Sequence, residues 1–362
     1  MAGRDLNVGW DASSMDAEHP FEFVGNAKDY FGIWIVNVLL SIVTLGIYAS
    51  WAKVRNKKYF YGHTLVDNHN FDYHATGKQL FIGKLIVVGV LAVLVVLQLV
   101  APMLYLLAVL AFLLVLPAII VRALRFNARV TSHRNVRFNF FGEYGDAFIT
   151  YFLIPMGNLF TLYLCTPFVS RAANRFAVNN HTYGDRKFSF DADIGDYYKP
   201  FLIALVTVIV LSIVLVGPAI GGLFKTLDGT DYANNEAAVF RFVLGFYALL
   251  FVVIFPAMLY YGAVIRNVMF NNTVLDNQHR FESTVNPFKY LWIVLSNTIA
   301  SVVTIGLLIP WARVRLARYM ASCTSLLAGG PLDGYSSDVS DTTGVVSSEY
   351  IDLEGIDIGI GI

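Results

Sequence analysis

The chain alternates between long apolar stretches and short polar segments. Seven stretches carry no Asp, Glu, Lys or Arg over about the 20 residues that one membrane crossing requires. They are Tyr30–Ala52, Leu85–Val100, Pro102–Val121, Ala147–Ser170, Pro200–Phe224, Phe242–Ile265 and Tyr290–Ala312. The second and third are separated only by Ala101, and Pro102 favours a break into a tight helical hairpin. The pattern predicts an all-α polytopic membrane protein with about seven hydrophobic helical segments.

Composition supports lipid as the solvent of these segments. Hydrophobic residues make up 56% of the chain and charged residues only 14%, whereas soluble domains carry about a quarter charged residues. The net charge is zero, so bulk charge predicts no nucleic-acid partner. The two cysteines have no metal-type spacing and predict neither a metal site nor another cofactor.

Two of the apolar segments share a pattern that recurs with an offset of 260 residues. The first copy contains Asn37, Thr44, Gly46, Trp51, Lys53 and Arg55, and the second contains Asn297, Thr304, Gly306, Trp311, Arg313 and Arg315. Agreement at this many positions, including the rare Trp, indicates an internal repeat. We call the segments containing them, 30–52 and 290–312, units A and C, and we interpret the segment 147–170 as a degraded copy, unit B.

Short polar segments between the apolar ones predict juxtamembrane β-hairpins. Each reads as two short strands around residues that tolerate tight turns. The expected turns are Asp67-Asn68, Ser132-His133, Gly184-Asp185 and Asp276-Asn277. The second strands carry alternating aromatic residues, and Phe21-Glu22-Phe23 resembles a further strand of this kind. We therefore expect a duplicated chain with a final half-copy.

This organisation sets the expected boundaries. A polar N-terminal tail covers residues 1–20, membrane repeat 1 covers 21–145, membrane repeat 2 covers 146–287 and a final half-repeat covers 288–320. Residues 321–362 contain seven acidic residues and no basic one, which predicts a disordered acidic tail.

The residues of unit A carry a resemblance to a known family. The run Thr44-Leu45-Gly46-Ile47-Tyr48-Ala49-Ser50-Trp51-Ala52-Lys53-Val54-Arg55, followed by Tyr59-Phe60, Thr64 and Phe71-Asp72-Tyr73-His74, is similar to the signature of the YjgN family. The resemblance extends from about Phe21 to about Met320. It implies a bacterial inner-membrane protein built around a domain of unknown function, and it brings no reaction, ligand or site residue.

Two topologies are compatible with the pattern. If all seven segments cross, the two sides carry 16 and 10 Lys and Arg residues, and the repeats are inverted. If units A, B and C instead dip in and return, the counts are 24 and 2, and all hairpins could pair into one small sheet on the same side. The charge count favours the second arrangement, although about 23 uncharged residues also fit one crossing. Both place the C-terminus in the cytoplasm.

Polar residues within the apolar segments are the first candidate site. Asn37, Thr44, Gly46, Asn158, Asn297, Thr304 and Gly306 either line a pathway for a small solute or pack helices together. Transmembrane polar residues most often form hydrogen bonds to neighbouring helices, which favours packing. If a path exists, we expect Asn37 and Asn297 to face each other across it.

The basic helix ends are the second candidate site. Trp51, Lys53, Arg55, Trp311, Arg313 and Arg315 are candidates for binding anionic lipid headgroups or for ordinary interfacial anchoring. The expected partner is therefore the lipid bilayer.

Two functions remain open after these observations. No segment contains Asp or Glu, which disfavours an ion-coupled transporter, and no catalytic motif points to an enzyme. A small-solute transporter or channel and a non-transporting module that organises lipid or partner proteins are the two hypotheses.

Overall fold

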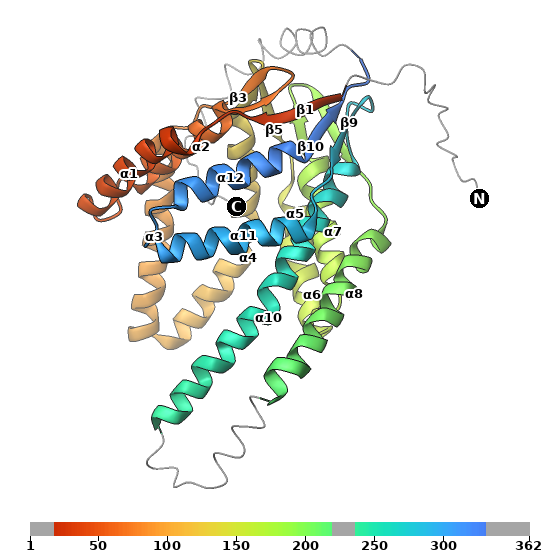
Figure 1. Ribbon diagram of the computed structural model, residues 1–362. Coiled ribbons are helices and arrows are strands. Elements are labelled where there is room, and N and C mark those ends of the chain that lie inside the picture. Colours follow the sequence, from red (N-terminus) through yellow and green to blue (C-terminus); the bar gives the residue numbers. More distant parts are fainter. Residues whose placement is uncertain (1–17, 219–235, 331–362) are drawn as a thin grey trace.

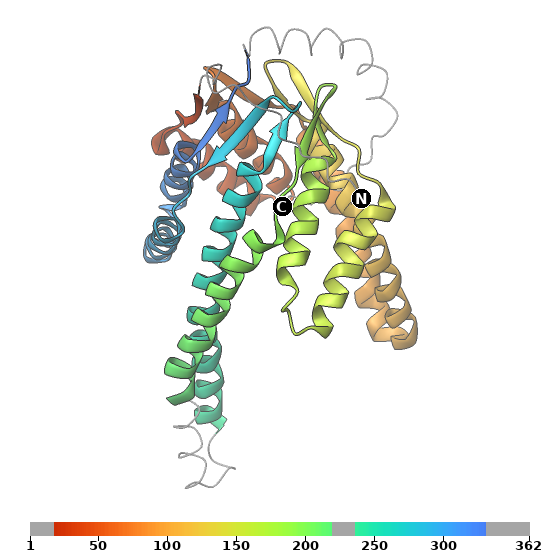
Figure 2. The same cartoon turned by 90° about the vertical axis from the view of Figure 1, so that its right-hand side faces the viewer.

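A computed structural model describes residues 18–218 and 236–330 (Figure 1). Residues 1–17 of the expected N-terminal tail and most of the acidic tail lie outside the described residues, whereas residues 18–20 belong to the first strand. Short strands gather at one end of the molecule and helices extend away from them (Figures 1 and 2). The fold is thus mainly helical, with all described strands in one layer at the same end.

Ten antiparallel strands close into a barrel in the order β1-β10-β9-β8-β7-β6-β5-β4-β3-β2. Their bounds are β1 Glu18–Phe23, β2 Thr64–Val66, β3 His69–Tyr73, β4 Thr131–His133, β5 Val136–Phe140, β6 His181–Tyr183, β7 Arg186–Phe190, β8 Thr273–Leu275, β9 His279–Ser283 and β10 Thr324–Leu327. The first and last strands pair with each other, Glu18 opposite Leu327. Closure therefore joins the two ends of the described chain and leaves no free sheet edge.

The alternation of the strand sequences explains which face is inside. Phe71 lies opposite His133 and Phe138 lies opposite Tyr183, so these rings share one face. Asp72 and Asn139, one residue further along their strands, point to the other face because side chains alternate along a strand. The aromatic alternation seen in the sequence is thus the inward face of a barrel.

Three of the four predicted turns are confirmed and one is wrong. Residues 67–68, 184–185 and 276–277 connect strands as expected. Ser132 and His133 instead belong to β4, and Arg134 and Asn135 make the turn, with φ of 51° and 64°. Two consecutive left-handed residues form the type of hairpin turn whose twist matches that of the strands. This turn was missed because arginine, at its first position, is not a residue that marks a turn in a sequence.

The helices form five antiparallel pairs. Their bounds are α1 Ala27–Val43, α2 Ala49–Gly62, α3 Gly77–Val100, α4 Pro102–Arg129, α5 Tyr144–Phe148, η2 Ile149–Leu153, α6 Ile154–Phe160, α7 Thr166–Asn179, α8 Ile194–Leu211, η3 Ser212–Val216, α10 Glu236–Asn271, α11 Pro287–Val303 and α12 Ile309–Ser322. Within the described residues four helices are long and apolar enough to span a membrane: Gly77–Val100, Pro102–Arg129, Ile194–Leu215 and Val243–Asn271.

Within the described residues, units A, B and C supply no helix that is long and apolar enough to span a membrane. Each folds as two helices joined by a five-residue turn, α1–α2, α6–α7 and α11–α12. A barrel strand precedes the first helix of each unit and another follows the second, so each unit leaves the barrel and returns to it. Of the seven expected hydrophobic helical segments, four correspond to candidate spans and three to short hairpins. Closure of the described strands into one barrel fits the arrangement in which units A, B and C dip in and return, and does not fit the crossing arrangement with inverted repeats.

The three turns share one backbone conformation. Two consecutive residues are left-handed in each: Leu45 and Gly46 in unit A, Leu162 and Tyr163 in unit B, and Ile305 and Gly306 in unit C. Leu and Ile rarely adopt a positive φ, so they do not mark a turn in the sequence. The length of such an uncharged run is therefore the same as that of one continuous helix. This explains why apolar length alone suggested a crossing.

The structured chain extends past the expected final half-repeat. Residues 324–327, which the sequence placed within the acidic tail, form β10 between β1 and β9. Thr324, Ser325 and Leu326 are all buried. The last strand of the barrel thus lies beyond the boundary that charge alone suggested.

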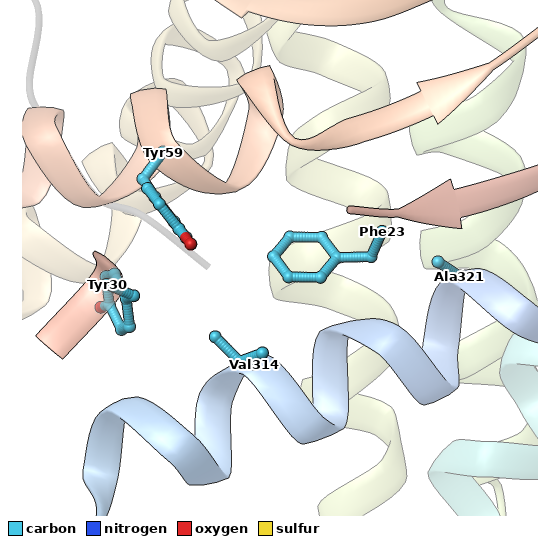
Figure 3. Close-up of a cluster of buried hydrophobic side chains, with 5 residues drawn as sticks. All are labelled: Phe23, Tyr30, Tyr59, Val314 and Ala321. Carbon is cyan, nitrogen blue, oxygen red and sulfur yellow. The ribbon is translucent and has the colours of Figure 1, made fainter. Parts of the chain in front are cut away.

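Five similar clusters of buried side chains hold the helices to the barrel. In one of them Phe23 of β1, Tyr30 of α1, Tyr59 of α2 and Val314 and Ala321 of α12 pack together (Figure 3). Corresponding clusters join α2 to α3 and α4, α4 to α5 and α7, α7 to α8 and α10, and α10 to α11 and α12. The helical pairs therefore follow one another around the barrel in a closed cycle.

Candidate functional site

The interior of the barrel is filled by aromatic rings. Successive ring centroids lie 4.7 to 6.4 Å apart along a path that runs through Phe21, Phe71, His133, Tyr183, Phe138, Phe188 and Phe281. Such spacing is that of packed aromatic pairs. The barrel interior is thus a hydrophobic core.

Charged side chains cluster at the hairpin turns between the strands. Asp67 accepts from Arg134 at 3.2 Å and lies 3.0 Å from Nδ1 of His19. Asp276 pairs with Arg186 at 3.1 Å. Burial, followed by the positive charge of Arg134, lowers the pKa of His133 to about 4. His133 is therefore a neutral member of the core at neutral pH.

The candidate asparagines make their hydrogen bonds within their own hairpins. Asn37 is 3% exposed, donates to Oδ1 of Asn56 at 3.1 Å and accepts from Arg55 at 3.4 Å. Asn297 is 7% exposed, donates to the carbonyl of Ala312 at 3.0 Å and accepts from Arg315 at 3.0 Å. Each amide thus ties the first helix of its unit to the second.

Asn158 has a related role in unit B but occupies a different register. Its side chain is buried and donates to Oγ1 of Thr166 at 3.2 Å, across the turn. The left-handed residues align Tyr163 with Gly46, which places Asn158 opposite Ser41 rather than Asn37. The same alignment pairs Phe168 with Trp51.

The candidate threonines and glycines build the turns. Oγ1 of Thr44 donates to the carbonyl of Leu40 at 2.7 Å and accepts from the backbone N–H of Tyr48 at 3.0 Å. Thr304 makes the same pair of bonds. Gly46 and Gly306 have φ of 84° and 89°, a region in which glycine has no steric cost. These contacts are local to each hairpin.

The two tryptophans have different surroundings. Trp51 lies against Gly77 at the start of α3, so closely that a Cβ on that glycine would lie 2.3 Å from the indole. Trp311 is 39% exposed and lies under the guanidinium of Arg315 at 5.1 Å. α3 follows unit A in the chain, whereas no helical pair follows unit C among the described residues. This difference explains why one indole is covered and the other is not.

The basic candidates also differ between units A and C. Arg313 donates to the hydroxyl of Tyr30 at 2.9 Å and so joins α12 to α1. Lys53 is its counterpart in unit A, but Leu80 occupies the place of Tyr30 at the start of α3 and offers no acceptor. Arg55 and Arg315 both bond to the asparagine of their own hairpin.

Sequence reasoning missed a second set of polar residues at the junction between helices and barrel. Arg125 donates to the carbonyl of Gly142, Arg318 to that of Gly25 and Asn267 to that of Val285. Each acceptor lies two residues after a barrel strand and directly before a helix N-cap. The sequence signal that could have revealed these acceptors is a small residue directly before Asn, Thr, Asp or Glu, which recurs along the chain.

Several basic side chains on the second helices of the pairs are left for solvent or ligand. Within the described part of the chain, Lys53, Lys58, Arg122 and Arg175 have neither a hydrogen bond nor an ion pair. Lys53 is half-buried and the other three are exposed. All four lie on the second helix of a helical pair, the helix that returns to the barrel.

Four candidate spans, three short hairpins and a closed barrel on one side define a multi-pass membrane protein. The chain belongs to the family described as bacterial protein of unknown function (DUF898), whose model matches residues 18–353. This confirms the resemblance stated from the sequence.

Curated relatives agree with this assignment. The chain is 27% identical to the inner membrane protein YjgN of Salmonella typhimurium over 87% of this chain and 90% of that protein. It is 26% identical to inner membrane protein YjgN of Escherichia coli O157:H7 over 87% of this chain and 89% of that protein. No solved structure matches the chain. The chain is thus an inner-membrane protein of a family without an assigned activity.

Proposed function

We propose that the chain is a non-transporting membrane module that holds its barrel on the cytoplasmic face of the inner membrane and binds anionic lipid headgroups there. The observation that carries the proposal is the set of hydrogen bonds that the candidate polar residues make. Asn37 and Asn297 each tie their own hairpin together, so neither amide is left to line a path for a solute.

Charge supports the cytoplasmic orientation. The second helices of the pairs carry arginine or lysine close to the barrel, for example Lys58, Arg125, Arg175 and Arg318. Bacterial inner-membrane proteins keep such residues on the cytoplasmic side. The barrel and β10, and with them the C-terminal part of the chain, then lie in the cytoplasm.

The unpaired basic side chains support headgroup binding. A basic residue close to an anionic leaflet contributes about 1 kcal/mol to membrane attraction. Lys53, Lys58, Arg122 and Arg175 have no competing acceptor within the described residues, whereas Arg55, Arg313 and Arg315 already bind protein groups. The first set is therefore the better candidate for lipid contact.

We expect the detergent-purified protein to retain phosphatidylglycerol in preference to phosphatidylethanolamine, and the double change Lys53→Gln and Arg122→Gln to weaken that preference. Removing two contacts of about 1 kcal/mol each should reduce retention roughly 30-fold. Native mass spectrometry measures the bound lipid directly.

Lys187→Gln is the matched control, because Lys187 is exposed on β7 and faces away from the helices. The proposal is wrong if the double variant and the control retain phosphatidylglycerol equally. An equal preference of the native chain for both lipids would also contradict it.

A further inference from the structure

The tips of units A and B lie level with the first turns of the neighbouring spanning helices. Nζ of Lys84, in the second turn of α3, donates to the carbonyl of Gly46 at the tip of unit A, at 3.1 Å. The hydroxyl of Tyr198, near the start of α8, donates to the carbonyl of Leu164 at the tip of unit B, at 3.4 Å. Because each contact joins a tip to a residue near the start of a span, each tip lies at the same depth as that part of its neighbouring span.

The remaining length of each span fixes where this level lies in a bilayer. From Lys84, α3 continues to Val100, about 24 Å at 1.5 Å per residue. From Tyr198, the helix continues through η3 to Val216, about 27 Å on the same rise. The hydrocarbon core is about 30 Å thick. If the spans cross it, the tips lie only a few ångströms inside the boundary on the barrel side.

Unit C matches unit A in its dimensions. Its helices have 17 and 14 residues, as do those of unit A, and α12 packs beside α1. Figure 1 shows α1, α2, α11 and α12 running crosswise to α3 and α4. The two units therefore form one broad layer that extends sideways from the base of the barrel.

The exposed surface at the tips of this layer is apolar. Leu45 and Ile305 at the tips are each 94% exposed, and Val43 and Val303 beside them are 79% and 76% exposed. The basic second helices α2 and α12 instead bind protein groups through Arg55, Arg313 and Arg315. An apolar face beside a basic helix is the pattern of a segment that lies in the interface plane, with its apolar side in the headgroup and acyl boundary.

We propose that units A and C form a wedge that inserts into the barrel-side leaflet alone, and that this wedge makes the protein prefer a membrane whose barrel-side leaflet is convex. Five helical pairs occupy area on the barrel side, and two of them continue through the opposite leaflet. A convex leaflet exposes more of the acyl boundary to such apolar residues, so the wedge binds it more strongly. The proposal holds whichever side of the cell membrane the barrel faces.

The test uses the full-length chain in giant vesicles of phosphatidylethanolamine and phosphatidylglycerol. In a background with Cys165→Ala and Cys323→Ser, Asn277→Cys is labelled from outside with an impermeant dye, so that only molecules with an external barrel are seen. A narrow tether is then pulled from the vesicle, and its protein density is compared with that of the flat membrane.

We expect enrichment in the tether of about twofold, equivalent to about 0.4 kcal/mol at 1.4 kcal/mol per tenfold. The variant with Val43, Leu45, Val303 and Ile305 changed to Ser should lose this enrichment while its monodispersity in detergent is retained. A control with Leu99, Val100, Met103 and Leu104 changed to Ser alters equally exposed residues at the far end of α3 and α4, and should keep it.

Absence of enrichment for the native chain would overturn the proposal, as would equal enrichment of the native chain and the tip variant. A spin label at Leu45 gives a second measurement that does not depend on curvature. A position near the headgroup boundary supports the wedge, whereas a position at the bilayer centre or in water contradicts it.

Discussion

A chain that ends after Ser322 should fail to fold, whereas one that ends after Gly330 should fold. The shorter chain lacks β10, which pairs with both β1 and β9 and closes the barrel. Its loss leaves two sheet edges unpaired and removes the acceptor Thr324 Oγ1 from the partly buried guanidinium of Arg266, which donates to it at 2.7 Å. Leaving a partly buried donor without one of its acceptors costs about 1 to 3 kcal/mol by itself.

The longer chain is the matched control, because it keeps every described contact of β10 and differs from the shorter one by only eight residues. Yield and elution profile of the two proteins in detergent decide the outcome. Equal monodisperse yields would show that the barrel does not need its tenth strand, and would contradict closure as the organising feature of the fold.

The stability of the protein should fall between about pH 6.5 and pH 4 because of His133. Its pKa is lowered from 6.5 to about 4, chiefly by burial and then by Arg134. The unfolded chain therefore binds a proton at a higher pH than the folded chain does. The stabilisation is fully present above pH 6.5 and is lost as the pH falls, by about 3 kcal/mol at 1.36 kcal/mol per pKa unit.

Thermal unfolding in detergent across this pH range provides the measurement, and His133→Phe provides the comparison. Phenylalanine keeps a ring between Phe71 and Tyr183, and the backbone carbonyl that accepts from the Tyr183 hydroxyl at 2.9 Å remains. The variant should lose most of the pH dependence. A residual slope is expected from His181, whose pKa is also lowered by burial. An unchanged slope would show that His133 titrates normally in the folded protein.

Much of the architecture could be predicted because local signals and global fold agree. Alternating aromatic residues at 71–73, 138–140 and 188–190 marked strands of the barrel. The uncharged run between Lys84 and Arg122 marked the hairpin of α3 and α4. The charge count favoured placing every hairpin on one side, and the barrel joins them all there.

Other features could not be predicted because their signals are absent from the local sequence. The reversal at Leu45-Gly46 depends on backbone angles that a leucine adopts rarely. At the start of β6 the residue that bonds back to its helix is His181, through Nδ1 to the carbonyl of Ala177 at 2.6 Å, where the other strands use a threonine. Thr64, Thr131, Thr273 and Thr324 make the corresponding bond.

The sequence identified the residues of the candidate site but did not predict the contacts that they make. Asn37 and Asn297 were expected to face each other if a path exists, and the structure places each against an arginine of its own hairpin. Spacing on a helix shows which residues share a face, but it does not show which helix covers that face. For the same reason Trp51 and Trp311 looked equivalent in sequence and differ in burial.

The central claim is that all four β-hairpin turns lie on one side of the membrane, and accessibility of single cysteines tests it most directly. Asn68, Asn135, Asp185 and Asn277 are exposed at the four turns and are each changed to Cys in a background with Cys165→Ala and Cys323→Ser. An impermeant thiol reagent is applied to intact spheroplasts and to inside-out membrane vesicles. We expect all four to react in the inside-out vesicles and none in the spheroplasts. Reaction of Asp185→Cys and Asn277→Cys on the opposite side from Asn68→Cys and Asn135→Cys would contradict the closed barrel and restore the crossing arrangement.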